Sequence, residues 1–162
     1  MAVEIRTGLQ PGDFGTIVHL HGVHFAREYG LDTTFEPYVA RTLADFVLDG
    51  AGCLWIAEAE GRVLGTIAIV HAGQNVAQLR WFLLVPEARG QGVGKRLLNE
   101  ALGYCRAHQM QRVFLHTFTD LKDAIRLYQR AGFTVAEEMR NWLWGAQRIE
   151  WRMELLLSPP AT

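Results

Sequence analysis

Apolar and polar residues alternate with two different periods along the chain, and each period predicts a type of element. Val3 and Ile5 alternate with polar neighbours, which is typical of a short strand. From Asp13 and again from Thr33, apolar residues recur at helical spacing. Thr33 with Glu36 three residues later predicts a capping box at the start of the second helix. The N-terminal part is therefore predicted to form one strand and two helices.

The rest of the chain is predicted to form strands separated by two further helices. Extended segments are expected at 53–59, 62–70, 76–85, 112–118, 133–139 and 148–157, and helices at 93–105 and 120–131. The order β-α-α-β-β-β-α-β-α-β-β indicates an α/β fold with a mixed sheet. We expect one domain over residues 1–157 and, because of its paired prolines, a flexible C-terminal tail over 158–162.

Composition and charge exclude several classes of protein. Apolar residues make up 49% of the 162 residues, enough for a packed core, and 16 basic side chains face 17 acidic ones. Without a basic excess we expect no nucleic-acid partner. No apolar stretch approaches the roughly 20 residues of a membrane span, and the N-terminus lacks the features of a signal peptide. We therefore expect a cytoplasmic protein with no membrane partner, whose Cys53 and Cys105 are reduced thiols.

A glycine-rich segment joins the strand at 76–85 to the helix at 93–105. Residues 85–96 read Val-Pro-Glu-Ala-Arg-Gly-Gln-Gly-Val-Gly-Lys-Arg, so three glycines leave backbone N–H groups open at a helix N-terminus, which favours a phosphate. The Walker spacing fails because Arg89 stands where its first glycine belongs, and the dinucleotide fingerprint lacks its third glycine. The pattern Arg-x-x-Gly-x-Gly resembles the acyl-CoA pyrophosphate loop of the GNAT superfamily of N-acetyltransferases.

A second motif about 30 residues downstream resembles the same superfamily. It reads Ala-Ile-x-Leu-Tyr-x-x-x-Gly-Phe over residues 124–133, and the order of elements is similar as well. The resemblance implies a GNAT fold, a mixed and mostly antiparallel sheet of about seven strands, flanked by four helices and splayed between the fourth and fifth strands. Segments 26–36 and 79–82 look like the acetyltransferase half of fusions with MarR-type helix-turn-helix regulators.

The resemblance implies acetyl-CoA as cosubstrate and no metal. The implied cofactor-binding residues are Phe82, Leu83, Leu84, Arg89, Gly90, Gln91, Gly92, Val93, Gly94 and Lys95. Leu121 departs from the pattern, because the family commonly has Asn there. The implied activity moves an acetyl group to a primary amine of a small molecule, peptide or protein by direct attack. The alternative is a non-catalytic acyl-CoA-binding sensor with the same fold.

Three side chains are candidates for proton transfer. Tyr128 matches the family position that often protonates the leaving thiolate, although it shares a helix face with Ile125 and core packing is the alternative. The general base is open between Glu28, in the segment that usually caps the acceptor site, and His116, near the end of the fifth strand. The alternatives are a solvated carboxylate at Glu28 and a histidine on the other side of the sheet at His116, and Glu36 of the same segment is expected to serve the capping box.

Further residues bear on the acceptor. Residues 25–50 contain five acidic residues and only two arginines, which predicts an acidic lip that attracts a cationic amine. The alternative is that these acids lie on solvated helix faces. We expect Trp142 and Trp144 to line the acceptor site, to pack in the core or to form a homodimer contact. His21 and His24 are the only workable metal pair of their helix, and we expect no metal there.

Overall fold

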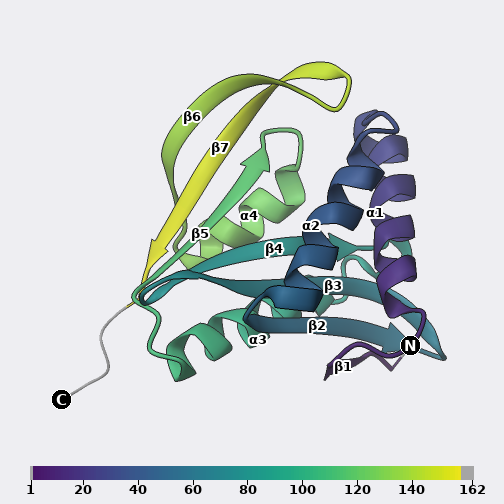
Figure 1. Ribbon diagram of the computed structural model, residues 1–162, viewed down its shortest axis with the longest axis horizontal. Helices are drawn as coiled ribbons and strands as arrows, with labels where there is room; N and C mark the ends of the chain where they lie inside the picture. The colour runs from purple at the N-terminus through teal and green to yellow at the C-terminus, as the bar shows by residue number, and fades with distance from the viewer. Residues whose placement is uncertain (1, 158–162) are drawn as a thin grey trace.

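The fold is a mixed seven-stranded sheet flanked by four helices, in a computed structural model that describes residues 2–157 (Figure 1). The strands are β1 (Glu4–Thr7), β2 (Gly52–Ala59), β3 (Arg62–Gly73), β4 (Val76–Leu84), β5 (Arg112–Phe118), β6 (Thr134–Leu143) and β7 (Ala146–Leu156). The helices are α1 (Asp13–Tyr29), α2 (Phe35–Asp49), α3 (Val93–Ala107) and α4 (Lys122–Ala131), with a 3₁₀ turn over Pro86–Ala88. The predicted fold class is confirmed, and the predicted tail at 158–162 lies outside the described residues.

The sheet has the order β1-β2-β3-β4-β5-β7-β6, and only β4 and β5 run parallel in the part of the chain that the structure describes. These two strands pair from Val76 opposite Arg112 to Gln78 opposite Phe114 and then separate. Beyond Gln78, β4 remains paired with β3 and β5 with β7, so one edge of β4 has no partner strand among the described residues. The predicted splay is therefore present, and Figure 1 shows β5, β6 and β7 rising away from β2–β4.

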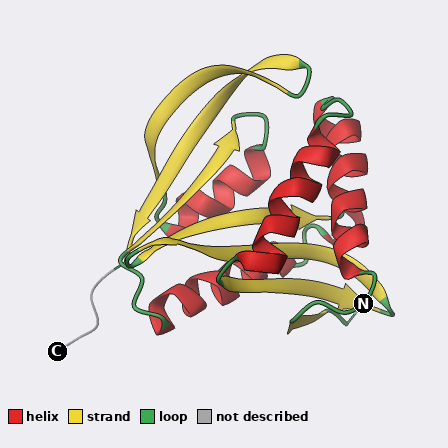
Figure 2. Cartoon of the chain, viewed as in Figure 1, coloured by secondary structure: helices red, strands yellow, loops and turns green. Residues whose placement is uncertain are grey.

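The helices cover the two faces of the sheet, because each has one apolar face (Figure 2). α1 and α2 bury Ile17 and Leu43 against one side of β2–β4. α3 and α4 bury Leu97 and Tyr128 with the opposite side. Gly132 ends α4 with a φ of 106°, a conformation that glycine tolerates best. No helix within residues 2–157 combines the length and apolarity needed to cross a bilayer.

The predicted capping box at the start of the second helix is wrong. α2 begins at Phe35, and its cap residue Thr34 makes no side-chain capping bond to any described residue. Instead, the carboxylate of Asp32 accepts the backbone N–H of Thr34 at 3.0 Å and also its hydroxyl. This local turn competes with the expected cap at Thr33. Glu36 points towards Gly22 of α1.

The last two strands are longer than predicted. We expected them at 133–139 and 148–157, but β6 reaches Leu143 and β7 begins at Ala146. Trp144 and Gly145 form the whole turn, with φ values of 50° and 98°. Two consecutive positive φ angles give a hairpin turn whose twist matches both strands, so pairing continues to the tip.

Candidate active site

A bulge bends β4 where the sheet opens. Thr66 pairs with Leu83 and Ala68 with Arg80, so two β4 residues lie opposite one residue of β3. Trp81 has a φ of 47°, and its carbonyl accepts the hydroxyl of Thr66 at 2.7 Å. The bulge thus sits at the junction of the two halves of the sheet, where functional sites are often built.

The predicted glycine loop connects β4 to α3. Gly90 and Gly92 have φ values of 76° and 78°, which favour glycine, and Gly92 is the residue before the helix. Among the described backbone bonds at the start of α3, the first is donated by the N–H of Arg96 to the carbonyl of Gly92. The N–H groups of the first turn of α3 are therefore available to an anion, as the sequence predicted.

A cleft of about 530 Å³ lies beside this loop, and we call it the loop cleft. It is lined by the end of β4, the glycine loop, the first turn of α3 and one face of α4, with contributions from α1. All predicted cofactor residues line it except Gln91, whose side chain donates to the carbonyl of Glu87 at 3.1 Å. Leu121, Ala124 and Leu127, which the sequence analysis placed in or beside the second motif, also line it. Sequence reasoning missed the remaining lining residues, which are Phe25, Tyr29, Asp123, Arg126 and Arg130.

The residues of the loop cleft fit acetyl-CoA. Open N–H groups and the Lys95 side chain suit the pyrophosphate, and Arg126 and Arg130 of α4 add positive charge to the cleft. The unpaired edge of β4 can bond an extended pantetheine chain as an added strand would.

Arg89 and Glu28 hold the end of β4 to α1. The Arg89 guanidinium donates from Nε and Nη2 to the Leu84 carbonyl at 3.1 and 2.9 Å, and from Nη2 to Glu28 Oε2 at 2.9 Å. The ion pair with Glu28 raises the pKa of Arg89. Glu28 lines the loop cleft, and both of its carboxylate oxygens are engaged by Arg89.

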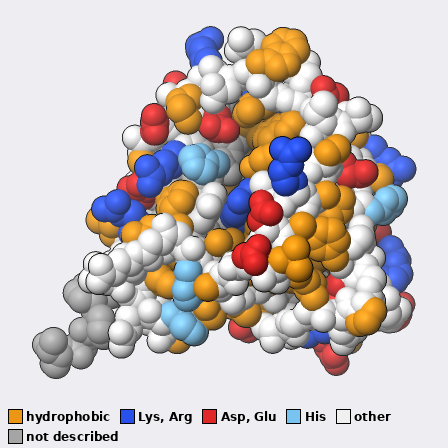
Figure 3. Space-filling model, viewed as in Figure 1, with side chains coloured by type: hydrophobic (Ala, Val, Ile, Leu, Met, Phe, Trp, Pro, Cys, Tyr) orange, Lys and Arg blue, Asp and Glu red, His pale blue; other side chains and the backbone are white. Residues whose placement is uncertain are grey.

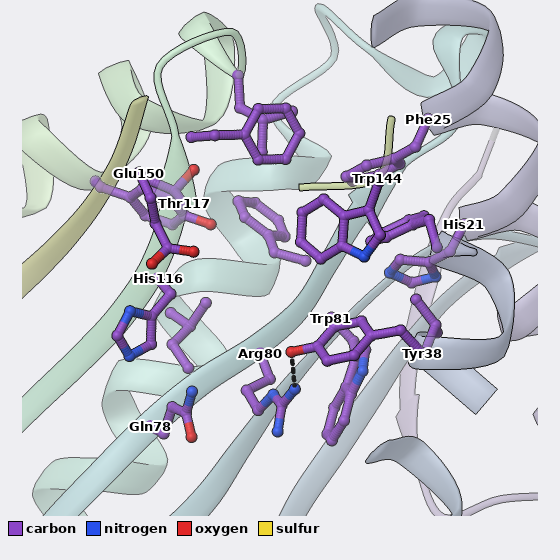
Figure 4. A pocket seen from close by; sticks show the side chains of 17 residues that line it. His21, Phe25, Tyr38, Gln78, Arg80, Trp81, His116, Thr117, Trp144 and Glu150 are labelled. Atoms are coloured by element: carbon purple, nitrogen blue, oxygen red, sulfur yellow. Dashed lines mark hydrogen bonds between the residues drawn. The ribbon is translucent and has the colours of Figure 1, made fainter. Parts of the chain in front are cut away.

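A second cavity of about 350 Å³ lies on the opposite side of the split, and we call it the aromatic pocket. Figure 4 shows Arg80 and Trp81 of β4 on its floor, His116 and Glu150 on the β5–β7 wall, and Tyr38 on the helical wall. In the space-filling view the surface is hollowed between the β6–β7 hairpin and the helices (Figure 3).

Aromatic rings form most of the apolar lining of this pocket. Phe35 lies 4.9 Å from both Phe25 and Trp144, measured between ring centroids, and Phe118 lies 6.1 Å from Trp144. The hairpin is bonded to the loop between α1 and α2, because the Trp144 carbonyl accepts the N–H of Asp32 at 3.0 Å. Of the two tryptophans considered for the acceptor site, Trp144 lines the pocket, whereas Trp142 is 69% exposed.

Two buried polar atoms in this pocket have no hydrogen-bond partner within residues 2–157. They are Nε2 of His21 and Oγ1 of Thr117. His21 Nδ1 lies 2.8 Å from the Ile17 carbonyl, which can only accept, so Nδ1 carries the proton and Nε2 is a free acceptor. Burial lowers the pKa of His21 to about 4. Buried polar atoms of this kind are normally hydrogen-bonded to protein or to ordered water.

Tyr128 is one of the side chains at which the two cavities meet. It lines both of them, together with Phe82, Leu121 and Phe25. Its ring packs 5.8 Å from Phe82 and 5.7 Å from Phe133, and burial raises the pKa of its hydroxyl well above the ordinary value. Tyr128 therefore packs in the core and also lines both cavities, and its role as an acid stays a prediction.

The remaining candidates fall into separate places. His116 lines the aromatic pocket as predicted, and Glu150, which sequence reasoning missed, lines it from β7. None of the five acids of the predicted acidic lip lines this pocket, because Glu28 pairs with Arg89 and the others lie elsewhere on the helices and the loop between them. That prediction is wrong. Within residues 2–157 no three metal-ligating His, Cys, Asp or Glu side chains gather.

Comparison with known proteins identifies the family. Residues 13–133 match the family described as "Acetyltransferase (GNAT) family". The chain is also 32% identical over 117 residues to the uncharacterized N-acetyltransferase YjgM of Escherichia coli, which covers 65% of this chain and 68% of that protein. This chain belongs to the GNAT acetyltransferase family.

Other GNAT proteins extend the comparison. The uncharacterized N-acetyltransferase MJ1207 of Methanocaldococcus jannaschii is 31% identical over 97 residues, 60% of this chain but only 38% of its own length. The yncA protein of Salmonella typhimurium, solved with its cofactor acetyl-CoA, superposes with a TM-score of 0.75 at 18% identity, covering 100% of this chain and 98% of that one. This structural likeness supports the GNAT fold of the chain.

Proposed function

We propose that this GNAT protein is an acetyl-CoA-dependent N-acetyltransferase whose acceptor is a primary amine of a small molecule or peptide. The observation that carries the proposal is the meeting of the loop cleft and the aromatic pocket at Tyr128. A donor bound in the first and an amine bound in the second would bring their reacting groups together there.

The loop cleft would bind acetyl-CoA, which supplies an acetyl group activated as a thioester. Backbone groups of Phe82, Leu83 and Leu84 would hold the pantetheine along the free edge of β4. The N–H groups at the start of α3 would bind the pyrophosphate, and the charge of Lys95 would add to the field of the helix N-terminus. Arg89 would position the end of β4 through Leu84 rather than contact an anion itself.

Proton transfer would use side chains of the junction and the aromatic pocket. Tyr128 would donate its proton to the sulfur of the leaving CoA, since burial keeps the phenol protonated. An attacking amine must be neutral, so a base must take its proton. His116 and Glu150 line the pocket and are the candidates, and Glu28 is the weaker one because its carboxylate is paired with Arg89.

Names of relatives support this reaction class, since YjgM and MJ1207 are both named N-acetyltransferases. The chain matches only part of MJ1207, so its own activity needs a direct test. The finer likeness to MarR-type fusions, the homodimer and the cytoplasmic location stay predictions.

The test is the release of free CoA thiol from acetyl-CoA in the presence of pooled primary amines. The pool contains polyamines, amino-sugar antibiotics, amino acids and short peptides, and mass spectrometry identifies any acetylated product. Release that requires both acetyl-CoA and an amine supports the proposal. If acetyl-CoA raises the Tm of the protein but no pool member is acetylated, the non-catalytic sensor replaces it. If acetyl-CoA does not bind, the assignment of the loop cleft is wrong as well.

A further inference from the structure

We infer that Arg80, Tyr38 and Gln78 form a carboxylate-binding site in the aromatic pocket, and that the acceptor is an amino acid with a free carboxylate and an aromatic or large apolar side chain. The inference rests on the proposed function and names its substrate class. It replaces the cationic acceptor that the sequence suggested with one that carries both charges.

Arg80 is a guanidinium without a carboxylate partner among the described residues. The ion pairs formed within residues 2–157 involve Arg6, Arg62, Arg89, Arg126, Arg148 and Arg152, but not Arg80. Its guanidinium stacks 4.5 Å from the Trp81 ring centre and donates one hydrogen bond, from Nη2 to the Tyr38 hydroxyl at 3.0 Å. Arginine has five N–H donors in a planar fork that suits a carboxylate. The lining of the pocket thus holds an oriented positive charge with donors to spare.

Tyr38 and Gln78 add donors beside this guanidinium. Because the Tyr38 hydroxyl accepts from Arg80, its own proton is free to donate to another acceptor. Gln78 lies two residues before Arg80 on β4, so the two side chains share a face of the strand and both line the pocket. Figure 4 shows the hydroxyl of Tyr38 meeting Arg80, with Gln78 farther along the same strand.

The opposite charge lies on another wall. Among residues 2–157, Glu150 is the only acid that lines the pocket, and it comes from β7 beside Thr117 and His116 (Figure 4). A ligand amine is attracted to this wall, and a carboxylate is repelled from it and drawn to Arg80. Arg80 also opposes a polyamine, which would bring several positive charges and no carboxylate.

The rest of the lining selects the side chain of the acceptor. Phe25, Phe35, Phe118 and Trp144 present ring surfaces, and aromatic or large apolar groups gain most from burial against them. A volume of about 350 Å³ is at the small end of ligand pockets, which fits one amino acid better than a long peptide.

The experiment compares acceptors that differ only in the carboxylate. Phenylalanine is paired with 2-phenylethylamine, tryptophan with tryptamine, and spermidine represents polyamines. The release of CoA thiol gives kcat/KM for each acceptor with wild type, Arg80→Gln, Tyr38→Phe and Arg41→Gln. Arg41 is an exposed arginine of α2 outside the pocket, so its variant is the matched control for loss of one charge. A Tm shift with acetyl-CoA confirms that each variant is folded.

Wild type is expected to prefer each amino acid over its decarboxylated partner by about 10- to 100-fold in kcat/KM, as a charge-assisted contact of this kind provides. In Arg80→Gln this preference falls towards one, mainly because KM for the amino acid rises. Tyr38→Phe lowers the preference less, and Arg41→Gln leaves it unchanged. Equal or better use of 2-phenylethylamine, tryptamine or spermidine by wild type overturns the inference and leaves the proposed function standing. The inference is likewise overturned if Arg80→Gln lowers kcat/KM for both partners of a pair equally. Release with no amine overturns the proposed function and the inference together.

Discussion

Removal of a single oxygen atom at Tyr128 tests whether the meeting point of the two cavities is the reaction centre. Tyr128→Phe keeps the ring, whose neighbours Phe82 and Phe133 lie at 5.8 and 5.7 Å between centroids. Burial raises the pKa of the Tyr128 hydroxyl, and no hydrogen bond from another described residue contributes to that shift. The fold therefore loses very little when the oxygen is removed, and an effect on catalysis can be attributed to the hydroxyl.

The two expected magnitudes differ widely. General acid catalysis by a positioned side chain contributes about 10²- to 10⁴-fold, so kcat should fall by that factor, or about 3–5 kcal/mol in activation free energy. The free energy of unfolding should change by less than about 1 kcal/mol, because the packing of the ring is conserved and no hydrogen bond among the described residues is lost. KM for acetyl-CoA should change little, since the pyrophosphate and pantetheine contacts lie elsewhere in the loop cleft.

The assay is the release of CoA thiol with saturating acetyl-CoA and the best acceptor, with urea unfolding of both proteins as the control for stability. The raised pKa adds a second criterion, because a phenol above its ordinary value stays protonated through pH 9. The pH profile of wild type should therefore show no alkaline decline from this group below pH 9. A fall in kcat of less than about threefold in Tyr128→Phe would refute its role as acid and leave it a packing residue.

Three further predictions concern the surroundings of the site. Glu28→Gln should raise KM for acetyl-CoA about tenfold with little change in kcat, because the carboxylate positions Arg89; a loss confined to kcat would restore Glu28 as the base. Gly145→Ala should lower the free energy of unfolding in urea by about 1–3 kcal/mol, since φ is 98° and a Cβ would lie 2.9 Å from Asp32 Oδ2; a loss below 0.5 kcal/mol, roughly the scatter of a neutral surface change, would contradict this. The pKa of His21 is about 4 when folded and 6.5 ordinarily, so the unfolded state binds the extra proton between these values and stability falls as the pH falls through this window. Between pH 7 and pH 4 the free energy of unfolding of wild type should fall by about 3 kcal/mol more than that of His21→Gln. If the free energies from urea unfolding change with pH in the same way in both proteins, burial does not hold this ring neutral.

The order and type of the elements could be predicted because the signals are local. A change in hydrophobic period marks the step from β4 to α3, and glycines mark the ends of helices. The predictions failed where a tertiary contact decides the local structure. Trp144 and Gly145 form a two-residue turn with positive φ at both positions, and the Trp144 carbonyl accepts the N–H of Asp32 in the loop before α2. The same Asp32 replaces the expected cap of α2.

The part of the loop cleft formed by the end of β4 and the glycine loop could be predicted, because a segment that presents backbone groups leaves a compact trace in the sequence. The turn at Gly90 and Gly92 needs positive φ, and that need appears as a fixed glycine spacing within a few residues. Gln91 is the exception, because glycine spacing does not determine where the side chain between two glycines points. Its amide turns back to the Glu87 carbonyl.

The acceptor residues could not be found this way, because they come from elements far apart in the chain. Arg80 is on β4, Tyr38 on α2 and Glu150 on β7, and no local sequence pattern links the three. Strand order places β7 beside β5, and the split after Gln78 opens the space between them and the helices. In the proposed function, backbone groups would hold the donor, while single side chains on three walls would select the acceptor. If Arg80 binds the carboxylate of the acceptor as inferred, Arg80→Gln changes the choice of acceptor while leaving both the sheet and the loop cleft unaltered.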